Sequence, residues 1–124
     1  MIKVNGIELD FDITSPADVT RYKQAGEKME AEGAKIQLPA LEPDNPAFLD
    51  AYIDMLNAEL RLFGNFLDDV FGDGVAARLL GGNPSLSKVA QINEALGLAM
   101  EEQGKAFGVR IQKYTPNRAA RRAK

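Results

Sequence analysis

The side chains in this sequence that could carry chemistry are mainly carboxylates, because the 124-residue chain contains no Cys, no His and no Trp. Asp68, Asp69 and Asp73 surround a Phe-Gly pair, and oxygen ligands of this kind suit Ca²⁺ or Mg²⁺. Their spacing does not match an EF-hand loop, and no Glu stands at the closing position. We therefore interpret the three as solvated surface side chains and expect no metal.

Glu101 and Glu102 are adjacent carboxylates that could act as an acid and a base. The pattern places them on an exposed helix face, with Lys105 one turn after Glu101 for an ordinary ion pair. Nothing indicates a pocket that would shift their pKa values. The lack of Cys and His also excludes thiol nucleophiles, disulfides, zinc fingers and Ser-His-Asp triads. We predict no catalytic residue, no cofactor and no enzymatic activity.

Two glycine-rich segments, 71–74 and 80–83, share the composition of phosphate-binding loops. Neither has the Lys-Ser/Thr pair or the strand–loop–helix setting of a P-loop. Glycine is also common where helices end and chains turn. We predict turns and helix caps at both segments.

Charge is distributed unevenly along the chain. Residues 1–70 hold 14 acids and 6 bases, residues 71–104 hold 4 acids and 2 bases, and residues 105–124 hold 7 bases and no acid. The formal charge of −3 therefore conceals an acidic body and a basic end, a pattern typical of interaction arms or solubilising tails. Our candidate partner-binding residues in this end are Tyr114, Asn117, Arg118, Arg121, Arg122 and Lys124.

Three uses of the basic end stay open: a solvated tail, a contact with nucleic acid or a membrane surface, and a contact with protein. Phosphates would use the same charges. However, Tyr114 is the only aromatic residue of the tail at 114–124 that could stack on bases, and the acidic body would repel phosphates at long range. We therefore favour docking onto an acidic protein surface and keep nucleic acid as the alternative.

The elements that must position these residues begin with a β-hairpin. Apolar residues occupy every second position from Ile7 to Ile13 and alternate with acids, which is the pattern of a half-buried strand. Asn5-Gly6 before them is a strong two-residue hairpin turn. Because an isolated hairpin is marginal in water, we expect its apolar face to pack on helices.

Three main helices and one short helix are predicted after the hairpin. Cap residues followed by proline mark helix starts at Ser15-Pro16 and Asn45-Pro46, and glycines mark the ends near 33 and 72. A short helix follows at 75–80. The last helix is predicted to begin at Asn83-Pro84-Ser85 and to end at Tyr114, with its apolar face interrupted by Gln103.

The helix predicted at 46–71 has the broadest apolar face. Seven apolar residues follow one another at alternating spacings of four and three, as in heptads: Leu49, Ile53, Leu56, Leu60, Phe63, Leu67 and Val70. We interpret this seam as a core stripe, while a dimer interface or a groove-binding surface stays open.

Together these elements predict one α+β domain at 1–113, with a hairpin packed on a small helical bundle, followed by a basic tail at 114–124. The length suits one domain and the 45% apolar content supports a core. The first residues lack the basic region and apolar core of a signal peptide. No apolar run approaches the roughly 20 residues that span a bilayer. We therefore expect a cytoplasmic protein without a membrane partner, and leave a homo-oligomer open.

Several segments resemble proteins encoded in the tail modules of tailed phages and prophages. The residues at 114–122, YTPNRAARR, are similar to the terminus of small tail-module proteins. The segments MIKVNGIELDFDI at 1–13, FLDDVFGDG at 66–74 and LLGGNPS at 79–85 resemble an uncharacterised phage family of Gram-positive hosts. This resemblance covers most of the chain.

The resemblance implies a role like that of phage tail assembly chaperones. Those are small, acidic, helix-rich, non-enzymatic proteins that hold tape-measure and tail-tube subunits during assembly and leave the finished virion. The resemblance transfers no catalytic residue. The alternative remains a nucleic-acid-associated regulator that binds through its basic end.

Overall fold

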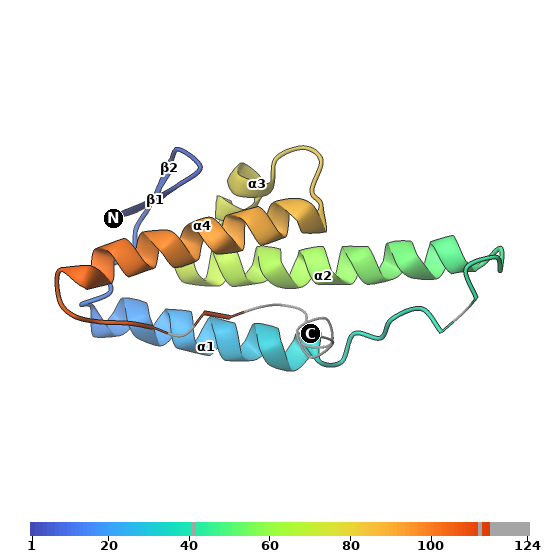
Figure 1. Ribbon diagram of the computed structural model, residues 1–124, viewed down its shortest axis with the longest axis horizontal. Coiled ribbons are helices and arrows are strands. Elements are labelled where there is room, and N and C mark those ends of the chain that lie inside the picture. Colours follow the sequence, from blue (N-terminus) through green and yellow to red (C-terminus); the bar gives the residue numbers. More distant parts are fainter. Residues whose placement is uncertain (41, 112, 115–124) are drawn as a thin grey trace.

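The computed structural model describes residues 1–40, 42–111, 113 and 114, and shows a hairpin beside a small bundle of helices (Figure 1). The described residues form β1 (Ile2–Val4), β2 (Ile7–Leu9), α1 (Pro16–Gly33), α2 (Phe48–Phe71), α3 (Val75–Leu80) and α4 (Leu86–Lys105). The predicted α+β fold is confirmed, with helices as the main content.

The hairpin forms because its turn residues accept positive φ angles. Asn5 and Gly6 have φ values of 51° and 80°, which suit a two-residue turn between twisted strands. β1 and β2 pair antiparallel with Val4 opposite Ile7, and the hairpin lies beside α4. The strand ends at Leu9, earlier than predicted, yet Phe11 and Ile13 continue the buried alternation.

Serine side chains begin two of the helices, as predicted. The Oγ atoms of Ser15 and Ser85 accept hydrogen bonds from the backbone N–H groups of Asp18 at 3.3 Å and Lys88 at 3.2 Å. α2 begins at Phe48, two residues later than predicted, because Asn45 holds a turn there. Its Oδ1 accepts from the Ala47 N–H and its carbonyl accepts from the Phe48 N–H, both at 2.9 Å.

The prediction that the last helix reaches Tyr114 is wrong, because α4 ends at Lys105. The N–H groups of Phe107 and Val109 both donate to the Gly104 carbonyl at 3.0 Å, and Gly108 adopts a φ of 67°. This reversal sends the following residues back alongside α1 (Figure 1). It needs glycine at 104, where a Cβ would lie 2.4 Å from the Val109 carbonyl oxygen.

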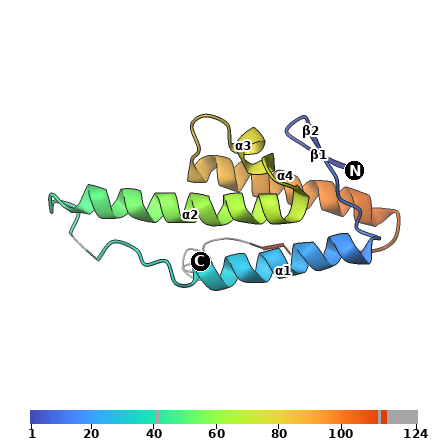
Figure 2. The same ribbon diagram turned by 180° about the vertical axis from the view of Figure 1, so that it is seen from behind.

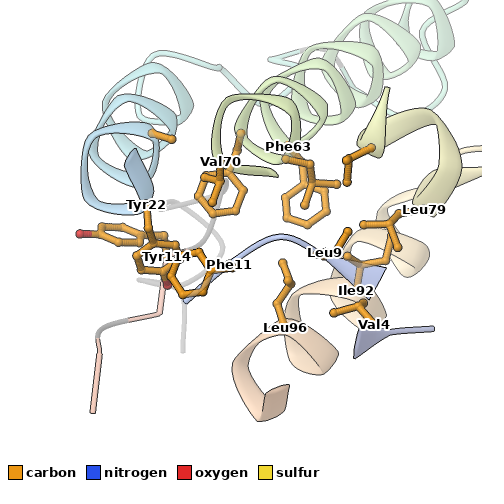
Figure 3. Packing of buried hydrophobic residues seen from close by; sticks show 14 of the residues in the cluster. Val4, Leu9, Phe11, Tyr22, Phe63, Val70, Leu79, Ile92, Leu96 and Tyr114 are labelled. Carbon is orange, nitrogen blue, oxygen red and sulfur yellow. The ribbon is translucent and has the colours of Figure 1, made fainter. Parts of the chain in front are cut away.

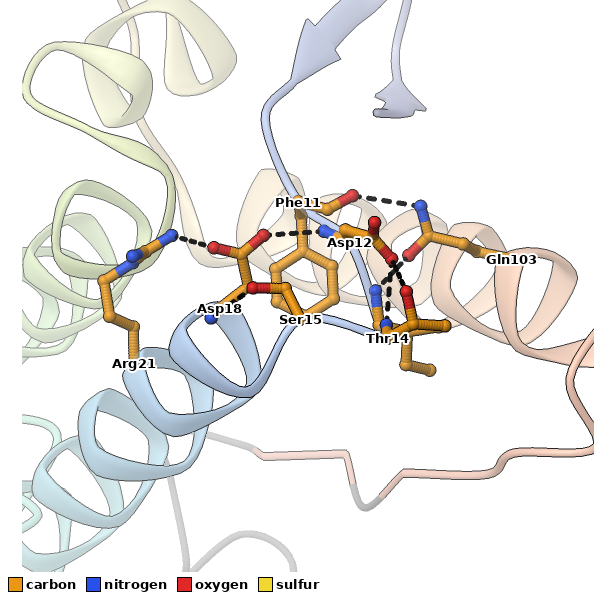
Figure 4. A network of polar contacts seen from close by, with 8 residues as sticks. Phe11, Asp12, Thr14, Ser15, Asp18, Arg21 and Gln103 are labelled. Atoms are coloured by element: carbon orange, nitrogen blue, oxygen red, sulfur yellow. Dashed lines mark hydrogen bonds and ion pairs between the residues drawn. The ribbon is translucent and has the colours of Figure 1, made fainter.

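Gln103 joins α4 to the chain that leaves β2 (Figure 4). Its Oε1 accepts from the Ile13 N–H at 2.8 Å, and its Nε2 donates to the Phe11 carbonyl at 2.9 Å. A side-chain amide thus provides the donor and acceptor that a neighbouring strand would otherwise supply. The polar residue that interrupts the apolar face of α4 is therefore a clamp on residues 11–13.

The core joins the hairpin to all four helices, and Tyr22 lies at its aromatic centre (Figure 3). The Tyr22 ring makes edge contacts with Phe11 and Phe66, each with centroids 6.0 Å apart, and with Tyr114 at 5.2 Å. Edge-to-face pairs of this kind add to the stabilisation from burial. One ring of α1 thus contacts the exit from the hairpin, α2 and the C-terminal segment.

Replacing Gln103 by Leu should destabilise the fold by about 1–3 kcal/mol, because the Ile13 N–H and the Phe11 carbonyl lose their partner. Gln91→Leu, an exposed change on the same helix, should alter stability by less than about 0.5 kcal/mol. Urea denaturation of both variants measures the difference. Equal stabilities of the two variants would show that the clamp contributes nothing.

Candidate interaction surface

Tyr114, the one candidate partner-binding residue among the described residues, is buried. It is 7% exposed, and its carbonyl accepts a hydrogen bond from Asn93 Nδ2 at 3.1 Å. Its ring fills a notch at Gly26, where a Cβ would lie 2.3 Å from the ring. Burial raises the pKa of the Tyr114 hydroxyl. Tyr114, the first residue of the predicted tail at 114–124, is therefore part of the core instead of offering an accessible side chain.

The other candidates of the basic end lie outside the described residues. They are Asn117, Arg118, Arg121, Arg122 and Lys124. Their role in partner binding stays a prediction.

The acidic residues near the end of α2 serve the local fold. Asp68 Oδ1 accepts from the Ala76 N–H at 2.9 Å and so holds the first turn of α3. Asp69 lies 3.9 Å from Lys28 of α1. Gly72 and Gly74, with φ values of 118° and 90°, form the turn between the helices. Within the described ranges, no group of three or more acidic side chains is placed to hold a metal ion.

At the end of α4, Lys105 pairs with Glu102 at 2.8 Å, not with Glu101 as expected. Both residues of this pair are exposed. The interaction raises the pKa of Lys105, through its hydrogen bond and charge attraction with Glu102.

The feature of α2 that stands out is a change in exposure along one face. Leu49 and Ile53 are 65% and 50% exposed, whereas Phe63 and Leu67, further along the same seam, are fully buried. Both views of the molecule show why: α1 and α4 lie beside the C-terminal half of α2, and its N-terminal half extends past them (Figures 1 and 2). The predicted core stripe is therefore core over half of its length.

We call Leu49, Tyr52, Ile53 and Leu56 the α2 patch. The first three are exposed and Leu56 is half-buried. Phe48 stacks on Tyr52, with ring planes 9° apart and centroids 6.0 Å apart, and this contact orders one end of the patch. The remaining large exposed apolar residues of the described chain, Met1, Leu38, Leu98 and Phe107, are dispersed over other segments.

The surroundings of the α2 patch are acidic. Residues 36–60 hold five acids and no Lys or Arg. Two of these, Asp50 and Asp54, lie within the patch segment itself and are exposed. The patch therefore combines apolar side chains with a local excess of negative charge.

Glu59 lies at the inner end of the patch and is 2% exposed. It stands one turn after Met55 and one turn before Phe63, both buried, and within the described part of the chain its Oε2 has no hydrogen-bond partner. Burial raises the pKa of this carboxyl. From the sequence, Glu59 counts only as one of the 14 acids of residues 1–70. Its spacing of four from Met55 and from Phe63 is the signal that places it on the apolar face.

The arrangement defines a class: a small, helix-rich α+β domain with one helix whose apolar face is partly uncovered. The chain belongs to the family of unknown function DUF6673, whose model matches residues 5–124. Neither the curated proteins nor the solved structures gave a match. Over the part of the chain that the structure describes, the helices are too short or too polar to cross a membrane.

The notch that holds Tyr114 can be tested with two glycines. Gly26→Ala should destabilise the fold by about 1–3 kcal/mol, because the new methyl group overlaps the Tyr114 ring. Gly64→Ala, whose Cβ would lie 3.6 Å from Ala76, should stabilise α2 by up to about 1 kcal/mol. Chemical denaturation gives both values. Stabilisation by both changes would contradict the packing of Tyr114 against Gly26.

Glu59 should make stability depend on pH. Because its pKa in the fold is raised from the ordinary 4.5, folding opposes its ionisation, and the stability associated with the neutral carboxyl is lost as pH rises through the raised pKa. The gain in unfolding free energy from Glu59→Gln should therefore grow as pH rises above the ordinary pKa of 4.5. Glu94→Gln, at an exposed site, is the control. A gain independent of pH would contradict this prediction.

Proposed function

We propose that this chain is a non-enzymatic phage tail assembly chaperone or accessory protein, which binds tape-measure or tail-tube subunits in the host cytoplasm. The α2 patch is the observation that carries the proposal. Leu49 and Ile53 leave at least half of their side-chain surface in water although they continue a buried seam. Contiguous exposed apolar residues bordered by charge are typical of protein interaction sites.

The patch suits reversible binding. Complete burial of a Leu or Ile side chain contributes about 1.5–3 kcal/mol, and the exposed members of the patch would gain a part of that each. Loss of translational and rotational freedom offsets much of the gain. A chaperone that releases its subunit when the tail assembles needs a balance of this kind. The resemblance of segments 1–13, 66–74 and 79–85 to a phage family supplies the biological setting.

The alternative function, nucleic-acid binding through the basic end, has one observation in its favour: residues 105–124 hold 7 bases and no acid. The buried position of Tyr114 disfavours base stacking by the tail at 114–124, because the one aromatic side chain of that tail packs on Tyr22 instead. Salt-dependent binding to DNA or RNA that disappears on deleting residues 117–124 would support the alternative.

Co-expression tests the proposed function. Tape-measure and tail-tube proteins encoded beside this chain should become several-fold more soluble when the chain is present. The double change Leu49→Asp, Ile53→Asp should abolish this effect, because it places charges in the patch. Leu98→Asp, an equally exposed Leu on α4, should retain it. Unchanged solubility of every partner with and without the chain would refute the proposal.

A further inference from the structure

We infer that the α2 patch binds one helix of another protein, an amphipathic helix whose apolar stripe is flanked by lysines or arginines. This inference rests on the proposed function for the natural partner, and it deepens that proposal by stating the site and the chemistry of what binds. Three observations support it: the shape of the uncovered face, the negative charge around it, and the burial of the Glu59 carboxyl at its inner end.

The uncovered face has the form of a helix-binding surface. Leu49, Ile53 and Leu56 keep the alternating spacing of four and three that continues into the buried seam at Leu60 and Phe63. This spacing packs well against a second helix at a shallow crossing angle. Residues 48–56 extend about 13 Å along the helix axis. A partner helix of two to three turns would cover them. It would lie along the N-terminal half of α2, next to the C-terminal half that α4 covers (Figures 1 and 2).

The charge of this segment selects a basic partner. Five acids and no base between residues 36 and 60 produce a negative field around the patch. Lysines or arginines that flank the partner's apolar stripe would be attracted, and acidic flanks would be repelled. The apolar side chains supply contact area, and the acids supply specificity.

The same charges disfavour a second copy of this chain as the occupant. A pair of copies joined through the patch would bring the exposed carboxylates of Asp50 and Asp54 of each copy close to those of the other. The basic end of the chain is also a poor occupant. Its residues 115–124 contain no aromatic, Leu, Ile, Val or Met side chain that could fill the apolar face.

Glu59 is the residue with which a cation of the partner would pair. It is 2% exposed, it follows Tyr52 and Met55 on the same side of α2, and its Oε2 has no hydrogen-bond partner among the residues that the structure describes. A buried carboxylate without a partner is unfavourable. A lysine or arginine from the partner helix that reaches the inner end of the patch would supply the opposite charge.

Two synthetic peptides test the inference with the full chain. Each has 21 residues with leucines at the first and fourth positions of three heptads, and one has lysines beside this stripe where the other has glutamates. Fluorescence anisotropy should show that the lysine peptide binds at least about tenfold more tightly, and that added salt reduces this preference. Equal affinities for the two peptides would overturn the assigned partner chemistry.

Three variants locate the binding site. Leu49→Asp, Ile53→Asp should weaken binding of the lysine peptide at least about tenfold, although its two added negative charges would strengthen a purely electrostatic contact. Glu59→Gln should weaken it by a smaller factor, and Leu98→Asp should leave it unchanged. Circular dichroism confirms that each variant folds. Undiminished binding by the double variant would overturn the site.

The oligomeric state provides a further test. Sedimentation should give a monomer for the free chain. A dimer that the Leu49→Asp, Ile53→Asp change converts to a monomer would show that a second copy occupies the patch, and would overturn the inference.

The inference and the proposed function can fail separately. Binding of the lysine peptide through the patch without any effect on tail-protein solubility would retain the site and refute the chaperone role. Solubilisation of a tail protein that the double variant retains would support the chaperone role and refute the site.

Discussion

The apolar face of α2 is longer than the rest of the domain can cover, and this mismatch governs the structure. At 24 residues the helix is about 36 Å long. The hairpin, α1, α3 and α4 gather around its second half, where Phe63 and Leu67 lose all contact with water. The first half keeps the same apolar pattern, but its seam residues Leu49 and Ile53 are largely exposed. A helix that folded only for its own domain would be expected to become polar where its neighbours end.

The elements that local sequence rules determine could be predicted well. Asn5-Gly6 and the caps at Ser15 and Ser85 act within a few residues, so the hairpin and two helix starts lie where expected. Features that depend on distant contacts could not. The end of α4 depends on how Val109 turns back over Gly104. The boundary between the buried and the exposed part of the α2 seam depends on where α4 begins. The burial of Tyr114 requires a notch 88 positions away, at Gly26.

Two polar residues, Gln103 and Glu59, lie on apolar helix faces, and they differ in whether their polar atoms are hydrogen-bonded. Gln103 interrupts an apolar face, and both polar atoms of its side-chain amide form hydrogen bonds there. The partners are backbone groups of Ile13 and Phe11. Glu59 interrupts another apolar face, and one of its oxygens has no hydrogen-bond partner in residues 1–40, 42–111, 113 and 114. The first arrangement stabilises the domain alone. The burial of the Glu59 carboxyl is unfavourable in the free chain and becomes favourable when another molecule brings a positive charge. We interpret the position of Glu59 at the inner end of the α2 patch in this way.

Amide hydrogen exchange along α2, measured for the free chain and with the lysine-flanked peptide bound, tests the central claim most directly. All residues of 48–56 except Met55 are exposed or half-buried, so their amides should exchange faster than those of residues 63–70 in the free chain. The peptide should slow exchange at 48–56 and leave 63–70 almost unchanged. Uniform protection along the whole helix in the free chain, or protection by the peptide at other segments only, would contradict the account.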